Sequence, residues 1–386
     1  MDKNTVHEKS LQLHKEHNGK LEVTPTIQVN NKEDLALAYT PGIAGVCKMI
    51  SEDKENAYQY TIKGKTVAII SNGTAVLGLG DIGPEASMPV LEGKALLLKK
   101  FGGVNAFPII IDSKDKDEIV NIISKIAPGF GGIHLEDIKA PECFYIEDEL
   151  KKKLDIPVYH DDQHGTAIAV LAGLINSLKI VDKKLEDVEV VINGAGASGI
   201  AIAKLLLAAG VKNIVLVDLQ GALVSGDKSL NDAQEEIAKV TNLNKESGTL
   251  EEVIKNKDVF IGVSDGNVMS KDTVRKMKKD SIIFALANPT PEIMPEEAKL
   301  GGAKVTATGR SDFDNQLNNV LVFPGIFKGA LKARVKNIND DIKIAAAKSL
   351  ANLVSKEELS PQYIIPSPFD KRVPDAVANA VIQASK

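Results

Sequence analysis

Gly194-Ala195-Gly196-Ala197-Ser198-Gly199 is the stretch that decides the fold. It fits the pattern G-x-G-x-x-G, which is weak alone but specific where it joins a strand to a helix. Here an apolar run over Glu189–Asn193 precedes it, a helical pattern over Ile200–Ala209 follows, and a second apolar run ends at Asp218. The first glycine permits a tight turn, the second lets a pyrophosphate approach the backbone, and the third lets helix pack on strand. The stretch predicts a Rossmann-type dinucleotide-binding domain whose helix N-terminus holds the phosphates.

Asp218 bears on the choice of cofactor, since it lies about 20 residues beyond the glycine stretch. A carboxylate there binds both ribose hydroxyls of NAD and repels the 2′-phosphate of NADP. The nearest cation, Lys228, stands beside Asp227, which offsets its charge. We therefore expect NAD, with NADP as the alternative.

Outward from this stretch, short apolar runs alternate with longer amphipathic ones. Runs that are apolar throughout suit parallel strands buried on both faces. The strands predicted in this way are Thr66–Ile70, Ala106–Ile111, Glu189–Asn193, Ile214–Asp218, Asp258–Val263 and Ser281–Ala287. An Ala- and Leu-rich run, Gly165–Leu178, predicts a long buried helix that connects two domains. We expect an α/β protein, with an N-terminal α/β catalytic domain over residues 1–165 and a C-terminal doubly wound dinucleotide-binding domain with a helical tail over residues 166–386.

Composition excludes several classes of partner. The chain has 386 residues, of which 44% are hydrophobic and 26% charged, enough to fill more than one core. A formal net charge of -5 argues against a nucleic-acid-binding surface, which would need a basic face. No apolar run reaches the ~18 residues that a membrane span needs. Cys47 and Cys143 are too few for a disulfide framework, so we expect a reducing, cytoplasmic setting.

Two acidic pairs follow strand-like runs. Glu136-Asp137 comes after Gly132–Leu135, and Asp161-Asp162 comes after Pro157–His160. In a parallel sheet both pairs lie at the carboxyl ends of strands, where such sheets bind ligands. Three converging carboxylates repel one another unless a cation lies between them. Because oxygen ligands favour Mg²⁺ or Mn²⁺ over zinc, we expect one of these two ions.

Other interpretations of these residues stay open. His160 and His164 have the i, i+4 spacing of a zinc-hydrolase helix, although Pro157–His160 predicts a strand that runs into a turn. The acidic residues could also cap helices or face solvent.

Further stretches complete a resemblance to the malic enzymes, in their short bacterial and archaeal form. They follow family order along nearly the whole chain, and they are Ala38–Gly42, Gly78–Gly83, Leu91–Lys94, Leu135–Asp137, His160–Thr166, Ala287–Thr290, Asn318-Asn319 and Phe323–Gly325. The resemblance implies a homodimeric, divalent-metal-dependent enzyme. Its reaction would be the oxidative decarboxylation of malate to pyruvate and CO₂ with reduction of NAD or NADP, and decarboxylation of oxaloacetate would be a side activity.

The resemblance also implies individual roles. The matches are Tyr39 as general acid, Lys94 as general base and substrate contact, Asp161 in the catalytic network, Glu136, Asp137 and Asp162 as metal ligands, Asn288 as a substrate and cofactor contact, and Asn318 and Asn319 as substrate contacts. A free lysine has a pKa near 10.4. We therefore expect burial or the nearby cation to lower the pKa of Lys94.

The chain departs from the family before Gly78. Larger eukaryotic enzymes carry there an arginine that grips a substrate carboxylate, whereas this chain has Thr74-Ala75-Val76-Leu77. The contact to the second carboxylate of malate is thus unassigned, and the backbone of Ser71–Thr74 is a candidate. Two alternative functions are a two-domain amino-acid dehydrogenase, whose activity would survive EDTA, and a non-catalytic nucleotide-sensing homologue.

Overall fold

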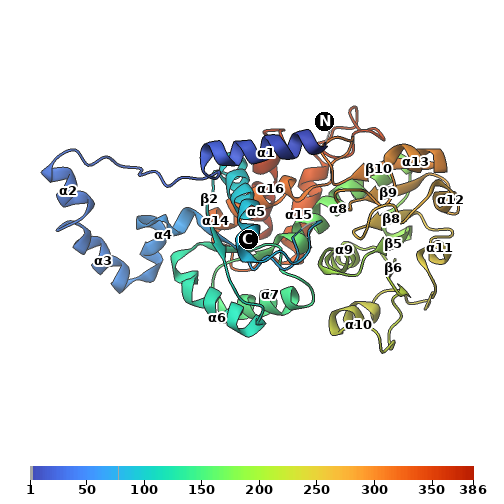
Figure 1. Cartoon of the computed structure of the whole chain (residues 1–386), viewed down its shortest axis with the longest axis horizontal. Helices are drawn as coiled ribbons and strands as arrows, with labels where there is room; N and C mark the ends of the chain where they lie inside the picture. The colour runs from blue at the N-terminus through green and yellow to red at the C-terminus, as the bar shows by residue number, and fades with distance from the viewer. Residues whose placement is uncertain (1–2, 77) are drawn as a thin grey trace.

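Two sheets and the long helix between them organise the chain (Figure 1). The computed structural model describes residues 3–76 and 78–386. In the first sheet the strands have the order β2-β1-β3-β4 and pair in parallel. These strands are β1 (Thr66–Ser71), β2 (Asn105–Ile110), β3 (Gly132–Leu135) and β4 (Val158–His160).

The first sheet is covered on both faces, because β1 alternates its side chains between two cores. Val67 and Ile69 belong to one core, with α5 (Pro84–Leu97) and the long helix, whereas Ala68 and Ile70 belong to another. The second core is closed by α6 (Lys116–Ile126) and α7 (Glu142–Lys153). Burial on both faces is the physical reason why this run is apolar at every position.

The second sheet has the strand order β10-β9-β8-β5-β6-β7. Its strands are β5 (Glu189–Asn193), β6 (Asn213–Asp218), β7 (Gly221–Ala222), β8 (Val259–Gly262), β9 (Ser281–Ala285) and β10 (Ala303–Thr308). β7 is antiparallel to β6, and the other pairs are parallel. With β5 taken as the first strand, this is the order of a dinucleotide-binding sheet, with a short hairpin strand in third place. The predicted fold class is confirmed.

The helices of this half are α9 (Ala197–Ala208), α10 (Asp232–Ala238), α11 (Leu250–Val253), α12 (Lys271–Val274) and α13 (Pro295–Gly301). The chain then continues into η6 (Asn319–Leu321), α14 (Phe323–Ala333), α15 (Asp340–Ala351) and α16 (Val373–Ala384). These last helices return to the first sheet. The rings of Phe323 and Phe327 lie 5.5 Å and 5.6 Å from the ring of His134, centroid to centroid. The division of domains after residue 165 stays a prediction.

The long helix, α8 (Asp161–Val181), begins directly at the end of β4 and is buried along most of its length. The predicted turn after His160 is therefore wrong. Asp161 and Asp162 occupy the first helical turn, where the helix dipole stabilises negative charge. Although α8 has 21 residues, neither it nor another described helix is long and apolar enough to cross a membrane.

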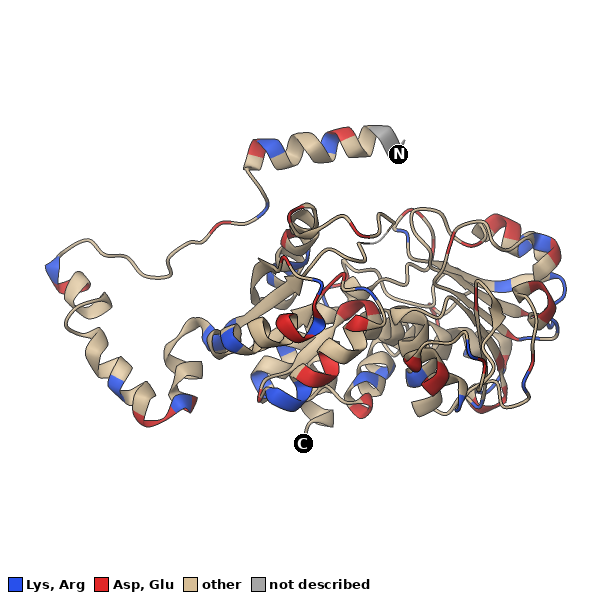
Figure 2. Cartoon of the chain, turned by 60° about the horizontal axis from the view of Figure 1, so that its bottom comes forward, with Lys and Arg blue, Asp and Glu red and all other residues tan. Residues whose placement is uncertain are grey.

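Residues 21–54 form an arm that projects away from both sheets (Figures 1 and 2). The arm contains α2 (Lys32–Ala38) and α3 (Ile43–Glu52). It lies between α1 (Lys3–His17) and α4 (Ala57–Tyr60). None of residues 5–65, whose side chains the structure describes, is buried.

Candidate active site

Three carboxylates meet where β3 and β4 end. Glu136 and Asp137 follow β3 directly, and Asp162 lies in the first turn of α8. One oxygen from each residue lies within 4.8 Å of the others. The backbone N–H of Asp137 donates to Asp162 Oδ2 at 2.9 Å, which links the two strand ends.

This cluster fits a hard divalent cation. Burial and neighbouring carboxylates raise the pKa of Asp137 to about 9, and burial raises the pKa of Glu136 to about 7. Asp137 Oδ2 is buried, and none of the described residues forms a hydrogen bond with it. A cation bound by these residues would stabilise their ionised carboxylates and would give Asp137 Oδ2 a partner. The donor atoms are all oxygen, which Mg²⁺ and Mn²⁺ prefer as ligands.

Lys94 projects from α5 into this cluster. Its Nζ is hydrogen-bonded to Asp161 Oδ2, and it lies 3.2 Å from Glu136 Oε1 and 4.8 Å from the ring centroid of Phe323. Burial lowers the pKa of Lys94, but the carboxylates of Asp161, Glu136 and Asp162 outweigh it and raise that pKa above its ordinary value. The carboxylates thus stabilise the ammonium group more than burial destabilises it, and the lowering of this pKa by a bound cation stays a prediction.

Asp161 is fully buried, and Gly165 makes room for it. A Cβ at Gly165 would overlap Asp161 Oδ1 and would lie 2.7 Å from Asn319 Cβ. Asn319 thus packs against the first turns of α8, close to Asp161. Asn318 instead caps η6, where its Oδ1 accepts a hydrogen bond from Val320 N at 2.9 Å.

The two histidines that could form a zinc-hydrolase motif contact different carboxylates. His160 Nε2 lies 3.0 Å from Asp162 Oδ2, whereas His164 Nε2 lies 2.7 Å from Glu147 Oε1. Neither cluster of potential metal ligands among the described residues includes His160 or His164. The geometry therefore does not support a zinc-hydrolase motif.

Glu147, on α7, was missed by the sequence analysis. Its buried carboxylate accepts hydrogen bonds from Gln163 Nε2 at 3.1 Å and from the backbone N–H of His160 at 3.3 Å, and it also contacts His164. Although burial opposes ionisation, His164 and Lys151 hold the pKa of Glu147 well below its usual range. Glu147 thus anchors the start of α8. No local pattern marks it, because its partners come from other elements.

His134 was missed as well, although β3 offered a signal. It precedes Glu136 by two residues, so that both side chains point to the same side of the strand. His134 Nε2 lies 2.8 Å from Glu136 Oε2. Burial lowers the pKa of His134 to about 4, and the hydrogen bond between its ring and Glu136 orients the carboxyl group.

The glycine stretch has the geometry that its pattern requires. Gly194 has φ of +110°, and a Cβ there would lie 2.6 Å from Val263 O. A Cβ at Gly199 would overlap Gly194 O, so that α9 can approach β5 only with glycine at this position. A Cβ at Gly196 would meet nothing within 4 Å, which leaves the backbone open to a phosphate.

Other predicted cofactor residues surround this turn. Asp218 ends β6, and its Oδ2 accepts a hydrogen bond from Gln234 Nε2 at 2.9 Å. Ala195 is buried, and Ala197 begins α9. Ser198 Oγ donates to the backbone oxygen of Asp162 at 2.8 Å, which brings the dinucleotide turn to the carboxylate cluster.

Asn288, in the loop after β9, lies opposite the loop that follows β1. A Cβ at Gly78 would lie 3.3 Å from Asn288 O. In that loop, the N–H of Gly73 donates to Ser71 Oγ and the N–H of Ala75 to Asp137 O. These two donors are already engaged, and Leu77 lies outside the described residues. The loop stays a candidate for the second carboxylate of malate.

Comparison with known proteins assigns the family. Residues 18–151 match the malic enzyme N-terminal domain, and residues 163–385 match the malic enzyme NAD-binding domain. The chain belongs to the malic enzyme family. This membership decides against the amino-acid dehydrogenase alternative.

Known malic enzymes match this one over nearly its whole length. It is 55% identical over 382 residues to a bifunctional malic/malolactic enzyme of Bacillus subtilis, covering 99% of this chain and 93% of that one. It is 56% identical over 367 residues to an NAD-dependent malic enzyme of Geobacillus stearothermophilus, covering 95% and 77%. The crystal structure of a malic enzyme from Pyrococcus horikoshii superposes with a TM-score of 0.95 at 47% identity, covering 98% and 90%.

One predicted catalytic residue of this malic enzyme lies away from the cluster. Tyr39 is the C-cap residue of α2 in the arm, and it is 64% exposed. In the part of the chain that the structure describes, no hydrogen bond joins residues 21–54 to the carboxylate cluster. The structure brings together the predicted base and metal ligands, but not the predicted acid.

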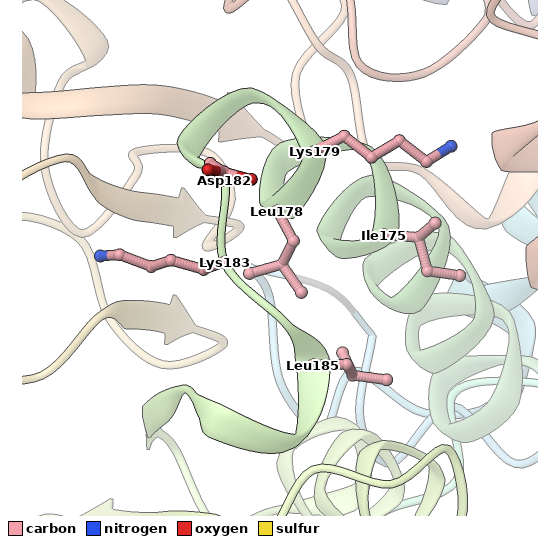
Figure 3. A pocket seen from close by; sticks show the side chains of 6 residues that line it. All are labelled: Ile175, Leu178, Lys179, Asp182, Lys183 and Leu185. Carbon is pink, nitrogen blue, oxygen red and sulfur yellow. The ribbon is translucent and has the colours of Figure 1, made fainter.

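A cavity of about 330 Å³ lies at the other end of α8 (Figure 3). It is lined by Ile175, Leu178, Lys179, Asp182, Lys183 and Leu185. Since α8 rises about 1.5 Å per residue, this end is roughly 20–30 Å from the carboxylates along the helix. The cavity is therefore separate from the candidate active site.

Proposed function

We propose that this malic enzyme oxidises malate to pyruvate and CO₂ with reduction of NAD. The observation that carries the proposal is the position of Lys94, whose Nζ contacts Asp161 and Glu136 at the edge of a carboxylate cluster that fits a divalent cation. A base beside such a cluster suits the removal of a proton from a hydroxyl group next to a carboxylate. The bound dinucleotide would lie close by, because Ser198 joins its turn to Asp162.

Glu136, Asp137 and Asp162 would hold Mg²⁺ or Mn²⁺. When bound, the ion supplies Lewis-acid polarisation of the C2 oxygen of malate. It also adds positive charge beside Lys94, which opposes the effect of the carboxylates on the lysine pKa. Lys94 then accepts the proton of the C2 hydroxyl group, while Asp161 fixes its Nζ in place.

The glycine stretch would hold NAD, whose nicotinamide would supply the acceptor for the hydride of C2. Loss of CO₂ from the resulting β-keto acid leaves an enolate, and Tyr39 donates its hydroxyl proton to the C3 carbon. Lys94, which holds the proton of the C2 hydroxyl group, returns a proton to Tyr39. Asn288, Asn318 and Asn319 contact the substrate, with Asn288 also near the cofactor. Because the β-keto acid formed from malate is oxaloacetate, decarboxylation of added oxaloacetate is the expected side activity.

Asp218 supports NAD over NADP, which stays the alternative. Gln234 holds the carboxylate at the end of β6, where a ribose hydroxyl would meet it. The relative from Geobacillus stearothermophilus is named NAD-dependent, whereas the one from Salmonella typhimurium is named NADP-dependent. We further propose a homodimer in the reducing cytoplasm, in keeping with the free thiols of Cys47 and Cys143.

Initial rates test these assignments together. Malate-dependent reduction should occur with NAD in the presence of Mn²⁺, more slowly with NADP, and not after EDTA treatment. The products should be pyruvate and CO₂. A protein that binds NAD but reduces none of it with malate and Mn²⁺ would instead support the non-catalytic, nucleotide-sensing alternative.

A further inference from the structure

A row of buried polar side chains lies behind the carboxylate cluster and ends on Asp162. The row begins at Glu147, on α7, and passes through Gln163 and His160. All three side chains are buried, and His160 is fully so. A buried polar group costs free energy unless it meets a suitable partner. Each member of the row therefore restricts the orientation of the next.

Glu147 fixes the orientation of the Gln163 amide. Its Oε1 lies 2.9 Å from Lys151 Nζ and 2.7 Å from His164 Nε2, and its Oε2 lies 3.1 Å from Gln163 Nε2. An ionised carboxylate only accepts hydrogen bonds. Gln163 must therefore turn its NH₂ group, and not its oxygen, toward Glu147.

The same NH₂ group decides which nitrogen of the His160 ring faces Asp162 with a proton. Gln163 Nε2 lies 2.9 Å from His160 Nδ1. Because an amide nitrogen only donates, Nδ1 must accept, which leaves the ring proton on Nε2. His160 Nε2 is buried and forms no aligned hydrogen bond with the described residues, but Asp162 Oδ2 lies within reach at 3.0 Å. The ring thus presents an N–H group to one oxygen of a proposed metal ligand.

The two oxygens of Asp162 have different surroundings. The backbone N–H of Asp137 donates to Oδ2 at 2.9 Å, and His160 Nε2 approaches the same oxygen from a second side. Among the described residues, no hydrogen bond reaches Oδ1, and the Asp162 side chain is 29% exposed. One oxygen is therefore engaged by N–H groups, and the other is open.

We propose that Gln163 and His160 are positioning residues for the cation, which hold Asp162 Oδ2 so that Asp162 Oδ1 is the oxygen left to bind Mg²⁺ or Mn²⁺. The inference rests on the proposed function, which makes Asp162 a metal ligand. A carboxylate that is already oriented loses less conformational freedom when the ion binds. Substitution of such partners of metal ligands lowers metal affinity by about 10–100-fold.

Titration with Mn²⁺ alone, without malate or NAD, tests the proposal. The electron paramagnetic resonance signal of free Mn²⁺ gives the dissociation constant independently of turnover. His160→Met fills a similar volume but lacks an N–H group, and it should weaken Mn²⁺ binding by about 10–100-fold. His160→Gln carries an N–H group near the position of Nε2 and should restore most of that affinity. Gln163→Met removes the group that directs the ring and should weaken binding by about 2–10-fold.

A matched control separates metal binding from folding. Asn176, on the same helix α8, is fully buried, and its Nδ2 donates to Ala351 O at 2.8 Å and to Ile364 O at 2.9 Å. Asn176→Leu should therefore lower Tm at least as much as Gln163→Met does, while keeping the Mn²⁺ dissociation constant of the parent. An equal loss of Mn²⁺ affinity in Asn176→Leu would show a merely structural effect and would overturn the proposal.

The remaining outcomes distinguish this proposal from the proposed function. Parental Mn²⁺ affinity in His160→Met, or equal losses in His160→Met and His160→Gln, would overturn the role of the His160 N–H group. Parental affinity in Gln163→Met would overturn the role of Gln163. A parent protein that binds no Mn²⁺ would instead overturn the proposed metal site, and this inference with it.

Discussion

Ser198 Oγ donates a hydrogen bond of 2.8 Å to the backbone oxygen of Asp162. Ser198 lies in the first turn of α9, next to the glycines proposed to receive a dinucleotide, and Asp162 lies in the first turn of α8, among the carboxylates. One hydrogen bond thus connects the cofactor turn with the proposed metal ligands. In the proposed mechanism, this bond sets where the nicotinamide lies relative to a substrate held by those carboxylates.

Ser198→Ala should therefore affect the use of both cofactor and substrate. Loss of one hydrogen bond of about 0.5–1.5 kcal/mol corresponds to a change of about 2–10-fold in kcat/KM. Steady-state kinetics with NAD and malate varied in turn would measure it. As a control, Ser124→Ala removes a comparable hydrogen bond, from Ser124 Oγ to Val120 O on α6. It should change kcat/KM for neither NAD nor malate. Equal kinetics for the two variants would refute the link.

The substitution Lys94→Arg tests whether Lys94 acts as a base or only as a positive charge. The guanidinium keeps a positive charge between Asp161 and Glu136, but it does not lose a proton near neutral pH. We expect malate oxidation to fall by about 10²–10⁴-fold, with NAD affinity and Tm close to those of the parent. Lys99→Arg, just beyond α5, serves as the control, because Lys99 bonds only to Asn105 among the described side chains. Near-normal turnover of Lys94→Arg would remove Lys94 from the base role.

Stability without metal should depend on pH through the carboxylates. The pKa values of Glu136 and Asp137 are raised to about 7 and about 9 by burial first. The folded protein then holds protons that the unfolded chain has lost, so stability in EDTA falls as pH rises from about 5 to about 9. Mn²⁺ competes with those protons. Its stabilising effect on Tm should be larger at about pH 8 than at about pH 6, and an equal gain at both would contradict this explanation.

Asp218→Ser should narrow the preference for NAD. The change removes the carboxylate that repels a 2′-phosphate and leaves Gln234 without its partner. The ratio of kcat/KM for NAD to that for NADP should fall by about tenfold, the effect of roughly 1.4 kcal/mol. Asp341→Ser, at an exposed acid in the first turn of α15, is the control. An unchanged ratio would show that another residue decides the preference.

The features that could be predicted are those that depend on residues close together in the sequence. The run Glu189–Asn193 is β5 with the same bounds, and the predicted run from Thr66 differs from β1 by one residue. Both strands are buried on two faces of a sheet. Burial on two faces requires an apolar run, and that run can be recognised in the sequence. The glycine stretch could be predicted for a similar reason, because the close contacts that require glycine belong to the turn itself.

The remaining features depend on partners that are distant in sequence. The start of α8 at Asp161 was missed because the Ala- and Leu-rich run that predicted this helix begins only at Gly165, whose lack of a side chain makes room for Asp161 and Asn319. Glu147 lies on a helix that is charged at many positions, and its contact with His164 exists only after α7 packs. The exposure of Tyr39 likewise depends on how the whole arm is placed, which no nearby pattern records.

The contact of α14 with His134 sets an order of events during protein synthesis. β3 and β4 leave the ribosome well over a hundred residues before Phe323 and Phe327, an interval of roughly 10–30 s at ordinary rates of translation. Until then His134 lacks its contacts with the two rings, and Lys94 lacks the ring that packs against its ammonium group. A nascent chain therefore cannot assemble its catalytic centre until most of its dinucleotide-binding half has been made.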